Sequence, residues 1–177
     1  GGFLGSGKTT AIVTACRLLI KQNRKVGVIT NDQGDQQVDS AFVKASGIPV
    51  REVTNGCFCC NYNQLDTQLR SLQEDERPEI IFAESVGSCT DLIATVVKPL
   101  AGLNPEIEIV ISIFVDAELL LSLMEGKSFF LEDSVRYIYK KQLEEADLLI
   151  LNKADLLTQQ QSKDLEASVK SEYNKKK

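Results

Sequence analysis

The fold is decided by the stretch Gly1-Gly2-Phe3-Leu4-Gly5-Ser6-Gly7-Lys8-Thr9-Thr10. Its residues 2–9 match the phosphate-binding pattern G-x-x-x-x-G-K-[ST], in which backbone N–H groups surround the phosphates of a nucleotide. Glycine is needed where the chain turns, because a Cβ would block the backbone torsions and the approach of phosphate oxygens. A glycine-rich surface turn is the alternative, but a helical pattern follows directly. The predicted nucleotide-binding residues are Gly2, Gly5, Ser6, Gly7, Lys8, Thr9 and Thr10; Lys8 is expected to reach the β- and γ-phosphates and Thr9 to bind Mg²⁺.

The composition excludes several classes of protein. Of 177 residues, 43% are hydrophobic and 25% are charged, so neither disorder nor membrane embedding is indicated. The net charge of −5 argues against a nucleic-acid surface, which needs a clustered basic field. We find no secretory signal and no apolar run of the ~18 residues that a membrane helix needs. Five cysteines, three of them nearly adjacent, fit a reducing compartment, so we expect a cytoplasmic protein without membrane or nucleic-acid partners.

Strand and helix patterns alternate along the chain. Short apolar runs predict strands, and apolar residues at helical spacing predict helices between them. This alternation predicts an α/β fold with a doubly wound, mostly parallel sheet in one P-loop domain over residues 1–177. Because a phosphate loop normally follows a central strand, we expect the first strand to be missing and the domain to be incomplete at both ends. The predicted strands are 25–30, 50–53, 80–83, 107–115 and 148–151, and the predicted helices include 8–23, 38–45 and 93–100.

Two further motifs follow predicted strands. Asn152-Lys153-Ala154-Asp155 resembles the guanine-recognition motif N-K-x-D, in which a carboxylate accepts the N1–H and the 2-amino group that adenine lacks. A helix N-cap is the alternative for Asp155. Glu84 is predicted to hold Mg²⁺ and Gly87 to sense the γ-phosphate through its N–H, so that Lys8, Glu84 and Gly87 form the catalytic set. A turn at the end of a strand is the alternative there. Asp32 is predicted in the Mg²⁺ shell, with a simple turn residue as its alternative.

Three cysteines within four positions form the sharpest feature after the phosphate loop. Thiolates are soft ligands suited to Zn²⁺ and other late transition metals, and Cys57, Cys59 and Cys60 can converge on one ion. The chain has no histidine, so a fourth ligand has to be water, a carboxylate, another subunit or Cys89. The alternative is that these thiols are buried as small hydrophobic side chains, and for Cys89 we prefer that alternative.

In this order the motifs resemble those of the CobW, HypB and UreG group of P-loop GTPases, which act in metal delivery and metalloenzyme maturation. The chain departs from the CobW pattern N-E-F-G, having Asn31-Asp32-Gln33-Gly34 instead. The matching segments are Gly2 to Thr10 with G-F-L-G-x-G-K-T-T, Gly56 to Cys60 with G-C-x-C-C, Glu84 to Gly87 with E-x-x-G, and Asn152 to Asp155 with N-K-x-D.

The resemblance implies a metallochaperone or maturation factor that binds and hydrolyses GTP and couples its GTP state to metal binding at the three cysteines. It implies GTP or GDP, Mg²⁺ and a transition metal as ligands, with Zn²⁺ as the first choice and Co²⁺ or Ni²⁺ as alternatives. It also implies a client metalloenzyme or apo-protein and a nucleotide-dependent homodimer. Hydrolysis should be slow without a partner, because no arginine or histidine is obviously placed to stabilise the transition state. Two other functions stay open: a conformational chaperone of a cofactor enzyme, such as a cobalamin enzyme, and a non-enzymatic metal buffer or sensor.

Overall fold

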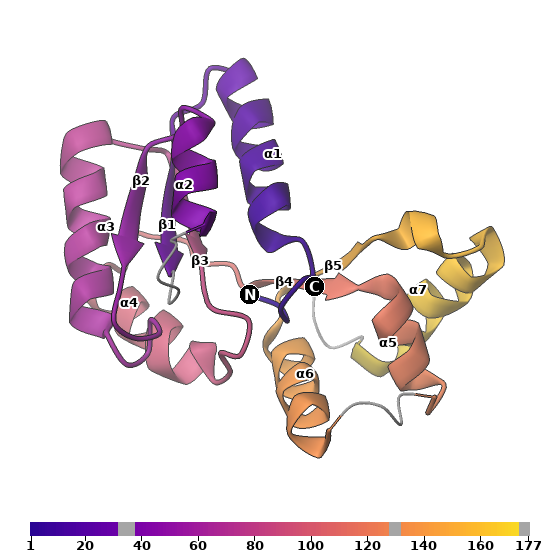
Figure 1. Ribbon diagram of the computed structural model, residues 1–177. Coiled ribbons are helices and arrows are strands. Elements are labelled where there is room, and N and C mark those ends of the chain that lie inside the picture. Colours follow the sequence, from indigo (N-terminus) through magenta and orange to yellow (C-terminus); the bar gives the residue numbers. More distant parts are fainter. Residues whose placement is uncertain (32–37, 128–131, 174–177) are drawn as a thin grey trace. The chain divides into compact units, whose positions relative to one another are not determined.

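The computed structural model describes residues 1–31, 38–127 and 132–173 (Figure 1). Asp32, predicted in the Mg²⁺ shell, lies outside the described residues. The chain forms two compact units. The three-stranded unit comprises Lys8–Val86 and Leu92–Glu106, and the two-stranded unit comprises Gly1–Gly7, Gly87–Asp91 and Ile107–Lys177.

The three-stranded unit contains parallel strands in the order β2-β1-β3. Helices α1 and α2 cover one face of this sheet and α3 covers the other (Figure 1). Because the strands are parallel, their carboxyl ends meet at one edge, where open α/β sheets bind ligands. Its elements are α1 (Lys8–Lys21), β1 (Val26–Asn31), α2 (Val38–Ala45), β2 (Val50–Val53), α3 (Tyr62–Glu76), β3 (Ile80–Glu84), the π-helix η1 (Ile93–Val97) and α4 (Lys98–Leu103).

Strand β1 is the centre of this unit, since all six of its residues are buried. On one face, Val28 packs in a cluster with Cys16 of α1 and Val43 of α2. Cys16 is therefore a core residue, as its helical spacing predicts. On the other face, a Cβ at Gly27 would lie 2.7 Å from Leu72 Cδ2, so the absent side chain lets α3 approach the sheet closely.

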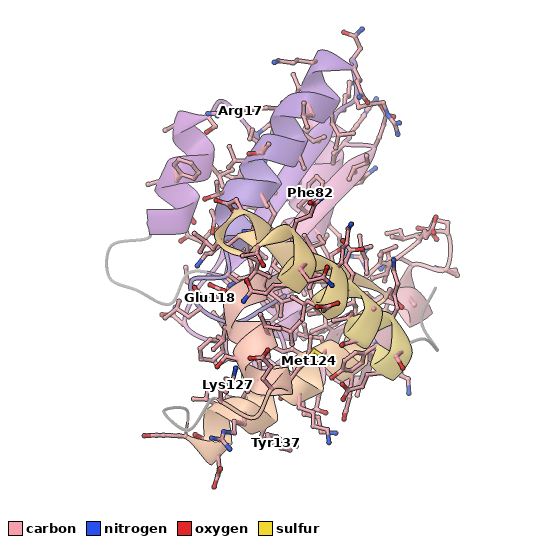
Figure 2. All side chains as sticks on the ribbon, turned by 90° about the vertical axis from the view of Figure 1, so that its right-hand side faces the viewer. Arg17, Phe82, Glu118, Met124, Lys127 and Tyr137 are labelled. Carbon is pink, nitrogen blue, oxygen red and sulfur yellow. The ribbon has the colours of Figure 1, made fainter. Side chains whose placement is uncertain are left out.

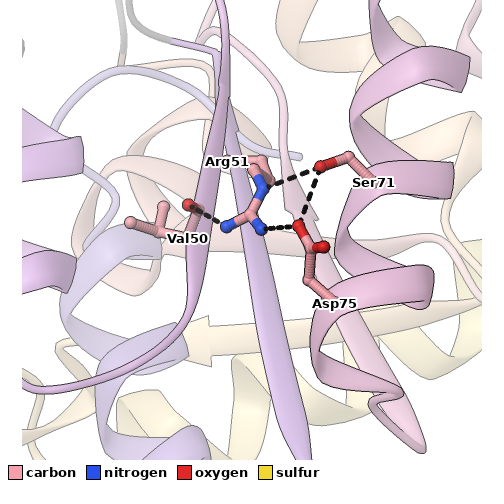
Figure 3. Close-up of polar contacts among 4 residues, drawn as sticks. All are labelled: Val50, Arg51, Ser71 and Asp75. Carbon is pink, nitrogen blue, oxygen red and sulfur yellow. Dashed lines mark hydrogen bonds and ion pairs between the residues drawn. The ribbon is translucent and has the colours of Figure 1, made fainter.

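Arg51 braces the edge strand β2 against α3 (Figure 3). Its guanidinium donates to Asp75 Oδ2 at 2.6 Å, to Ser71 Oγ at 3.2 Å and to the Val50 carbonyl at 3.2 Å. Asp75 is largely exposed, so the ion pair itself contributes only about 0–1 kcal/mol. The contact matters more for position than for stability. It holds β2 against α3, and the cysteine loop joins these two elements.

The two-stranded unit pairs β4 with β5 in parallel, from Ser112 opposite Leu148 to Asp116 opposite Asn152. At the other edge of β4, Gly1 N donates to Ser112 O at 2.7 Å and Phe114 N donates to Gly1 O at 3.0 Å. The elements are β4 (Ser112–Asp116), α5 (Ala117–Met124), α6 (Asp133–Glu145), β5 (Leu148–Asn152), the 3-10 helix η2 (Ala154–Leu156) and α7 (Gln159–Tyr173).

Helices α5, α6 and α7 bury a second apolar cluster against β4. It contains Val115, Leu120, Tyr139, Leu143 and Leu165, with Met124 packed beside it (Figure 2). In the other unit, Phe82 of β3, also labelled in Figure 2, packs against the first cluster. No helix in the described ranges is long and apolar enough to cross a membrane.

The α/β class with parallel strands, predicted from the alternation of patterns, is confirmed, and the strands are divided between two sheets. One edge of β4 carries β5 and the other carries Gly1. Helix α1 ends at Lys21, two residues before the predicted end, because Asn23 adopts a left-handed φ of 59°. Strand β4 begins only at Ser112, where pairing with β5 begins, and Ile107 and Val110 are more than half exposed.

The helix predicted over residues 93–100 is a π-helix followed by α4. Pro99 lies in the first turn of α4. Proline has no N–H to donate to the preceding helical turn, so the backbone register changes just before it.

Candidate functional site

Cys57, Cys59 and Cys60 lie in the cysteine loop, residues 54–61, which joins β2 to α3. Phe58 is only 2% exposed and anchors this loop in the core. Cys57 and Cys59 are half-buried and Cys60 is exposed. Asn61 N donates to Cys57 O at 2.9 Å, which closes the turn around the three thiols. The C-F-C-C order thus combines one buried anchor with thiols that stay accessible.

The three sulfur atoms converge. Cys57 Sγ lies 2.8 Å from Cys59 Sγ and 3.1 Å from Cys60 Sγ, and Cys59 Sγ lies 3.9 Å from Cys60 Sγ. Tetrahedral Zn²⁺, with Zn–S bonds of about 2.3 Å, spaces its sulfur ligands about 3.8 Å apart. Small outward movements therefore suffice to place one ion among the thiols. Among the described residues, no Asp, Glu or further Cys places a ligand atom within 4.8 Å of all three sulfur atoms, so the described group supplies three ligands.

The Cys59 thiol is biased toward its protonated form. Burial, together with the neighbouring thiols of Cys57 and Cys60, raises the pKa of the Cys59 thiol to about 12. Metal ions bind thiolates, so an ion has to replace protons here. The cluster is suited to a soft divalent or monovalent cation rather than to a hard one such as Mg²⁺.

Thr9 and Glu84 meet at the same sheet edge as the cysteine loop. The Thr9 hydroxyl, at the start of α1, donates to Glu84 Oε1 at 2.8 Å, and Glu84 is the buried last residue of β3. A hydroxyl and a carboxylate are hard oxygen ligands of the kind that Mg²⁺ prefers. The neighbouring Lys8 is 8% exposed and Thr10 is exposed. In this unit the structure thus brings two predicted Mg²⁺ ligands together, and Asp32 is outside the described residues.

The first part of the phosphate loop is held by Asn152, the last residue of β5. Asn152 Nδ2 donates to Ser6 O at 2.8 Å. Gly7 has a φ of +85°, and a Cβ there would lie 2.3 Å from Asn152 Nδ2. Any side chain at Gly7 would therefore displace the amide that holds Ser6. Gly2 is buried beside β4, whereas Gly5 is exposed.

The two charged residues that follow Asn152 differ in their contacts: Lys153 bonds Asp116, and Asp155 is exposed. Lys153 adopts a left-handed φ of 57°, and its Nζ donates to Asp116 Oδ2 at 2.8 Å. Burial by itself would raise the pKa of Asp116, but the Lys153 ammonium and the N–H groups of Leu119 and Glu118 together lower it. Asp155 lies in η2 and is exposed. Lys153 thus braces this loop against Asp116, and the carboxylate of Asp155 is exposed.

Gly87 is pressed against the phosphate loop within the two-stranded unit. A Cβ at Gly87 would lie 2.7 Å from Leu4 N, and a backbone atom cannot move aside cheaply, so glycine is required. Gln142 of α6 is 2% exposed and donates to Gly87 O at 3.0 Å and to Cys89 O at 2.9 Å. Cys89 is itself buried and lies in a different unit from the thiol cluster.

The sequence motifs do not reveal two residues that position these loops. Gln142 lies between Tyr139 and Leu143 on a helix with an apolar face, and a polar residue on such a face is the signal that could have identified it. Asn31 is the last residue of β1, and its side chain bonds the cysteine loop. In the sequence it is the first residue of the segment compared with N-E-F-G, and that comparison assigns it no contact with the cysteines.

Comparisons with known proteins extend these observations to the whole chain. The family model for "CobW/HypB/UreG, nucleotide-binding domain" matches residues 1–177. The zinc chaperone CobW of Sinorhizobium sp is 28% identical over 199 residues, which cover 99% of this chain and 55% of that protein. The zinc chaperone YeiR of Escherichia coli strain K12 is 32% identical over 166 residues, covering 89% of this chain and 46% of YeiR.

A solved structure supports the same fold. The crystal structure of HypB from Helicobacter pylori in complex with nickel superposes with a TM-score of 0.64 at 16% identity, over 96% of this chain and 71% of that one. The chain spans about half the length of the two zinc chaperones named above. With a family model that matches it from end to end and the ordered motifs described above, the chain belongs to the CobW/HypB/UreG family and carries its nucleotide-binding domain.

Proposed function

We propose that the protein binds and hydrolyses GTP and uses its nucleotide state to control a transition-metal ion held by Cys57, Cys59 and Cys60. Its role is then that of a metallochaperone or a metalloenzyme maturation factor, and the ion is its cargo. Zn²⁺ is the first candidate, because the three sulfur ligands suit it and two relatives are named zinc chaperones.

One observation carries this proposal: the thiol cluster and the Thr9–Glu84 pair lie at the same edge of one sheet. Glu84 ends β3, the cysteine loop follows β2, and both strands pair directly with β1. Only strand β1 therefore lies between the strand that carries Glu84 and the strand that leads to the thiols. Such closeness favours coupling, and a measured coupling energy is what demonstrates it.

The residues present fit a resident Mg²⁺ ion. Thr9 and Glu84 would hold it, and it would neutralise charge on the β- and γ-phosphates. Lys8 supplies a further positive charge, and the N–H of Gly87 is assigned to the γ-phosphate. In hydrolysis the oxygen of water forms a bond to the γ-phosphorus, the bond from this phosphorus to the bridging oxygen breaks, and GDP, phosphate and a proton are released.

Guanine selectivity is assigned to Asp155, with Asn152 and Lys153 shaping its loop. An accessible carboxylate next to a braced lysine supports this assignment, because it can accept both hydrogen-bond donors of guanine. The client protein and the nucleotide-dependent homodimer remain predictions that follow from the family.

Competition for Zn²⁺ against a chromogenic chelator tests the central claim. The full-length protein is titrated with a non-hydrolysable GTP analogue or with GDP present, and phosphate release from GTP is followed in parallel. We expect the two nucleotide states to differ in Zn²⁺ Kd by about fivefold or more, the lower end of typical allosteric coupling.

Lys8→Ala serves as the control, because it weakens the nucleotide contact without touching the thiols. This variant should keep the Zn²⁺ affinity of the nucleotide-free protein and lose the difference between nucleotide states. Equal affinities in both states of the wild-type protein would contradict the coupling. Zn²⁺ binding without any phosphate release, even with candidate client proteins, would instead favour a metal buffer or sensor.

A further inference from the structure

Asn31, at the carboxyl end of the central strand β1, holds the cysteine loop with its whole side-chain amide. Asn31 Nδ2 donates to Val53 O at 3.1 Å and to Gly56 O at 2.8 Å, and Asn31 Oδ1 accepts from Phe58 N at 3.1 Å. Asn31 is 7% exposed, so water cannot easily replace these bonds. Because Gly56 and Phe58 flank Cys57 in the sequence, one side chain sets where that cysteine's backbone lies.

One edge of β1 pairs with β2, and the other pairs with β3, the strand that carries Glu84. Thr30, the residue before Asn31, is in register with Glu84 of β3, and Glu84 accepts the Thr9 hydroxyl at 2.8 Å. Asn31 itself is in register with Val53 of β2. The end of β1 therefore lies between the strand that carries Glu84 and the strand that leads into the cysteine loop.

A second set of amides holds the same loop from the side of α3. Asn61 Nδ2 donates to Thr54 O at 2.7 Å and to Gln64 Oε1 at 2.8 Å, and Thr54 N donates to Gln64 Oε1 at 3.1 Å. These bonds lie within the loop and the first turn of α3 and include no residue of β1. They shape the thiol cluster without linking it to the central strand.

The geometry points to Asn31 as the positioning residue that makes metal affinity depend on the nucleotide. A displacement at Thr9 and Glu84 reaches β1 through its pairing with β3, and the Asn31 amide carries it to the backbone on both sides of Cys57. This inference rests on the proposed function, because it names the contact through which that coupling acts.

The test compares Asn31→Asp and Asn31→Ser with Asn61→Ser in the full-length protein. Asn31→Asp keeps the shape but sets a carboxylate oxygen against two carbonyl groups, and Asn31→Ser is neutral and too short for the three bonds. Zn²⁺ Kd is measured against the chromogenic chelator with a GTP analogue and with GDP. Binding of a fluorescent GDP analogue to the metal-free protein reports whether each variant is folded.

All three variants should raise the Zn²⁺ Kd by about tenfold, the usual cost of removing a group that orients metal ligands. The Asn31 variants should in addition reduce the ratio of Kd values in the two nucleotide states to about 1, whereas Asn61→Ser should keep the wild-type ratio. A merely structural role for Asn31 would leave that ratio unchanged.

The outcomes separate this inference from the proposed function. A wild-type ratio of one contradicts the proposed function and this inference with it. A wild-type difference that persists in a folded Asn31 variant overturns the role of Asn31 alone. A ratio lost equally in Asn61→Ser also overturns it, because any loosening of the loop would then be sufficient. If Asn31→Ser fails to bind the GDP analogue, the isosteric Asn31→Asp decides.

Discussion

Asn31 and Asn152 both end a parallel strand, yet they hold their neighbouring loops in different ways. Asn31 is almost fully buried and uses its amide for three bonds, one to the last residue of β2 and two to the cysteine loop. Asn152 is half-buried and gives one bond to Ser6 O, while the next residue, Lys153, is braced by Asp116. The cysteine loop is thus preorganised by the protein, whereas the loop with Asp155 leaves its carboxylate exposed.

Removing the thiols is the variant for which we expect the largest effect. The triple variant Cys57→Ser, Cys59→Ser, Cys60→Ser should weaken Zn²⁺ binding by about a thousandfold or more, because all three sulfur ligands are lost. GTP affinity of the metal-free protein should not change. Isothermal titration with Zn²⁺ and then with GTP measures both. Cys16→Ala, in the core of the same unit, is the matched control and should keep one high-affinity Zn²⁺ site; its loss there would contradict the assignment.

Asp155→Asn tests the proposed role of the exposed loop in guanine recognition. An amide cannot accept both guanine donors, so GTP affinity should fall by about a hundredfold and the affinity for xanthosine triphosphate should rise. Competition with a fluorescent GDP analogue measures the preference. Asp164→Asn, an exposed carboxylate on α7, should change neither affinity. Retained GTP selectivity in Asp155→Asn would remove that residue from base recognition.

A third loop, which contains Gly87 and Cys89, is held by the buried amide of Gln142. Gln142→Leu leaves the carbonyl groups of Gly87 and Cys89 without this donor, which should lower the free energy of unfolding by about 2 kcal/mol. Chemical denaturation measures the loss. Gln160→Leu, an exposed residue of α7, should cost less than about 0.5 kcal/mol. Equal small losses in both variants would show that Gln142 does not hold this loop.

The Asp116–Lys153 pair predicts the smallest effect and a defined dependence on pH. The folded state lowers the pKa of Asp116, so its contribution to stability is present above the unfolded-state pKa and is lost as the pH falls through the folded-state pKa. Asp116→Asn keeps an N-cap oxygen for Glu118 N and Leu119 N but removes the charge. At neutral pH the loss should be on the order of 0.5 kcal/mol, because Lys153 is partly exposed.

Thermal unfolding of both proteins from pH 7 down to pH 2 measures this effect. The melting temperatures should differ at neutral pH and converge in acid, where the wild-type carboxyl is protonated. A difference that grows as the pH falls would have the wrong sign for this pair.

Several elements could be predicted from the sequence because their signals are local. Helix α2 and strand β2 begin and end where their patterns predict, and α3 ends just before Pro78, which cannot continue a helix. The C-F-C-C spacing also indicated convergent thiols, because three cysteines within one turn have little room to separate. Strand β4 was predicted too long, since its boundary depends on pairing with β5 rather than on apolar residues.

The roles of Asn31 and Gln142 depend on partners that are far away in the sequence. Asn31 bonds residues 22 to 27 positions later, and Gln142 bonds carbonyl groups 53 and 55 positions earlier. Neither residue belongs to a repeating pattern of its own, so neither was assigned a role from the sequence. Their functions became visible only when the strands and helices were packed.

The sequence alone determined the family and the α/β class, and it predicted the kinds of chemistry, because phosphate, guanine and soft metals each require particular groups at short, recognisable spacings. Only the tertiary structure decided which amide holds which loop, and that the single strand β1 separates the strand ending at Glu84 from the strand that leads into the cysteine loop. Those facts depend on strand order and side-chain packing, which bring together residues that no local pattern connects.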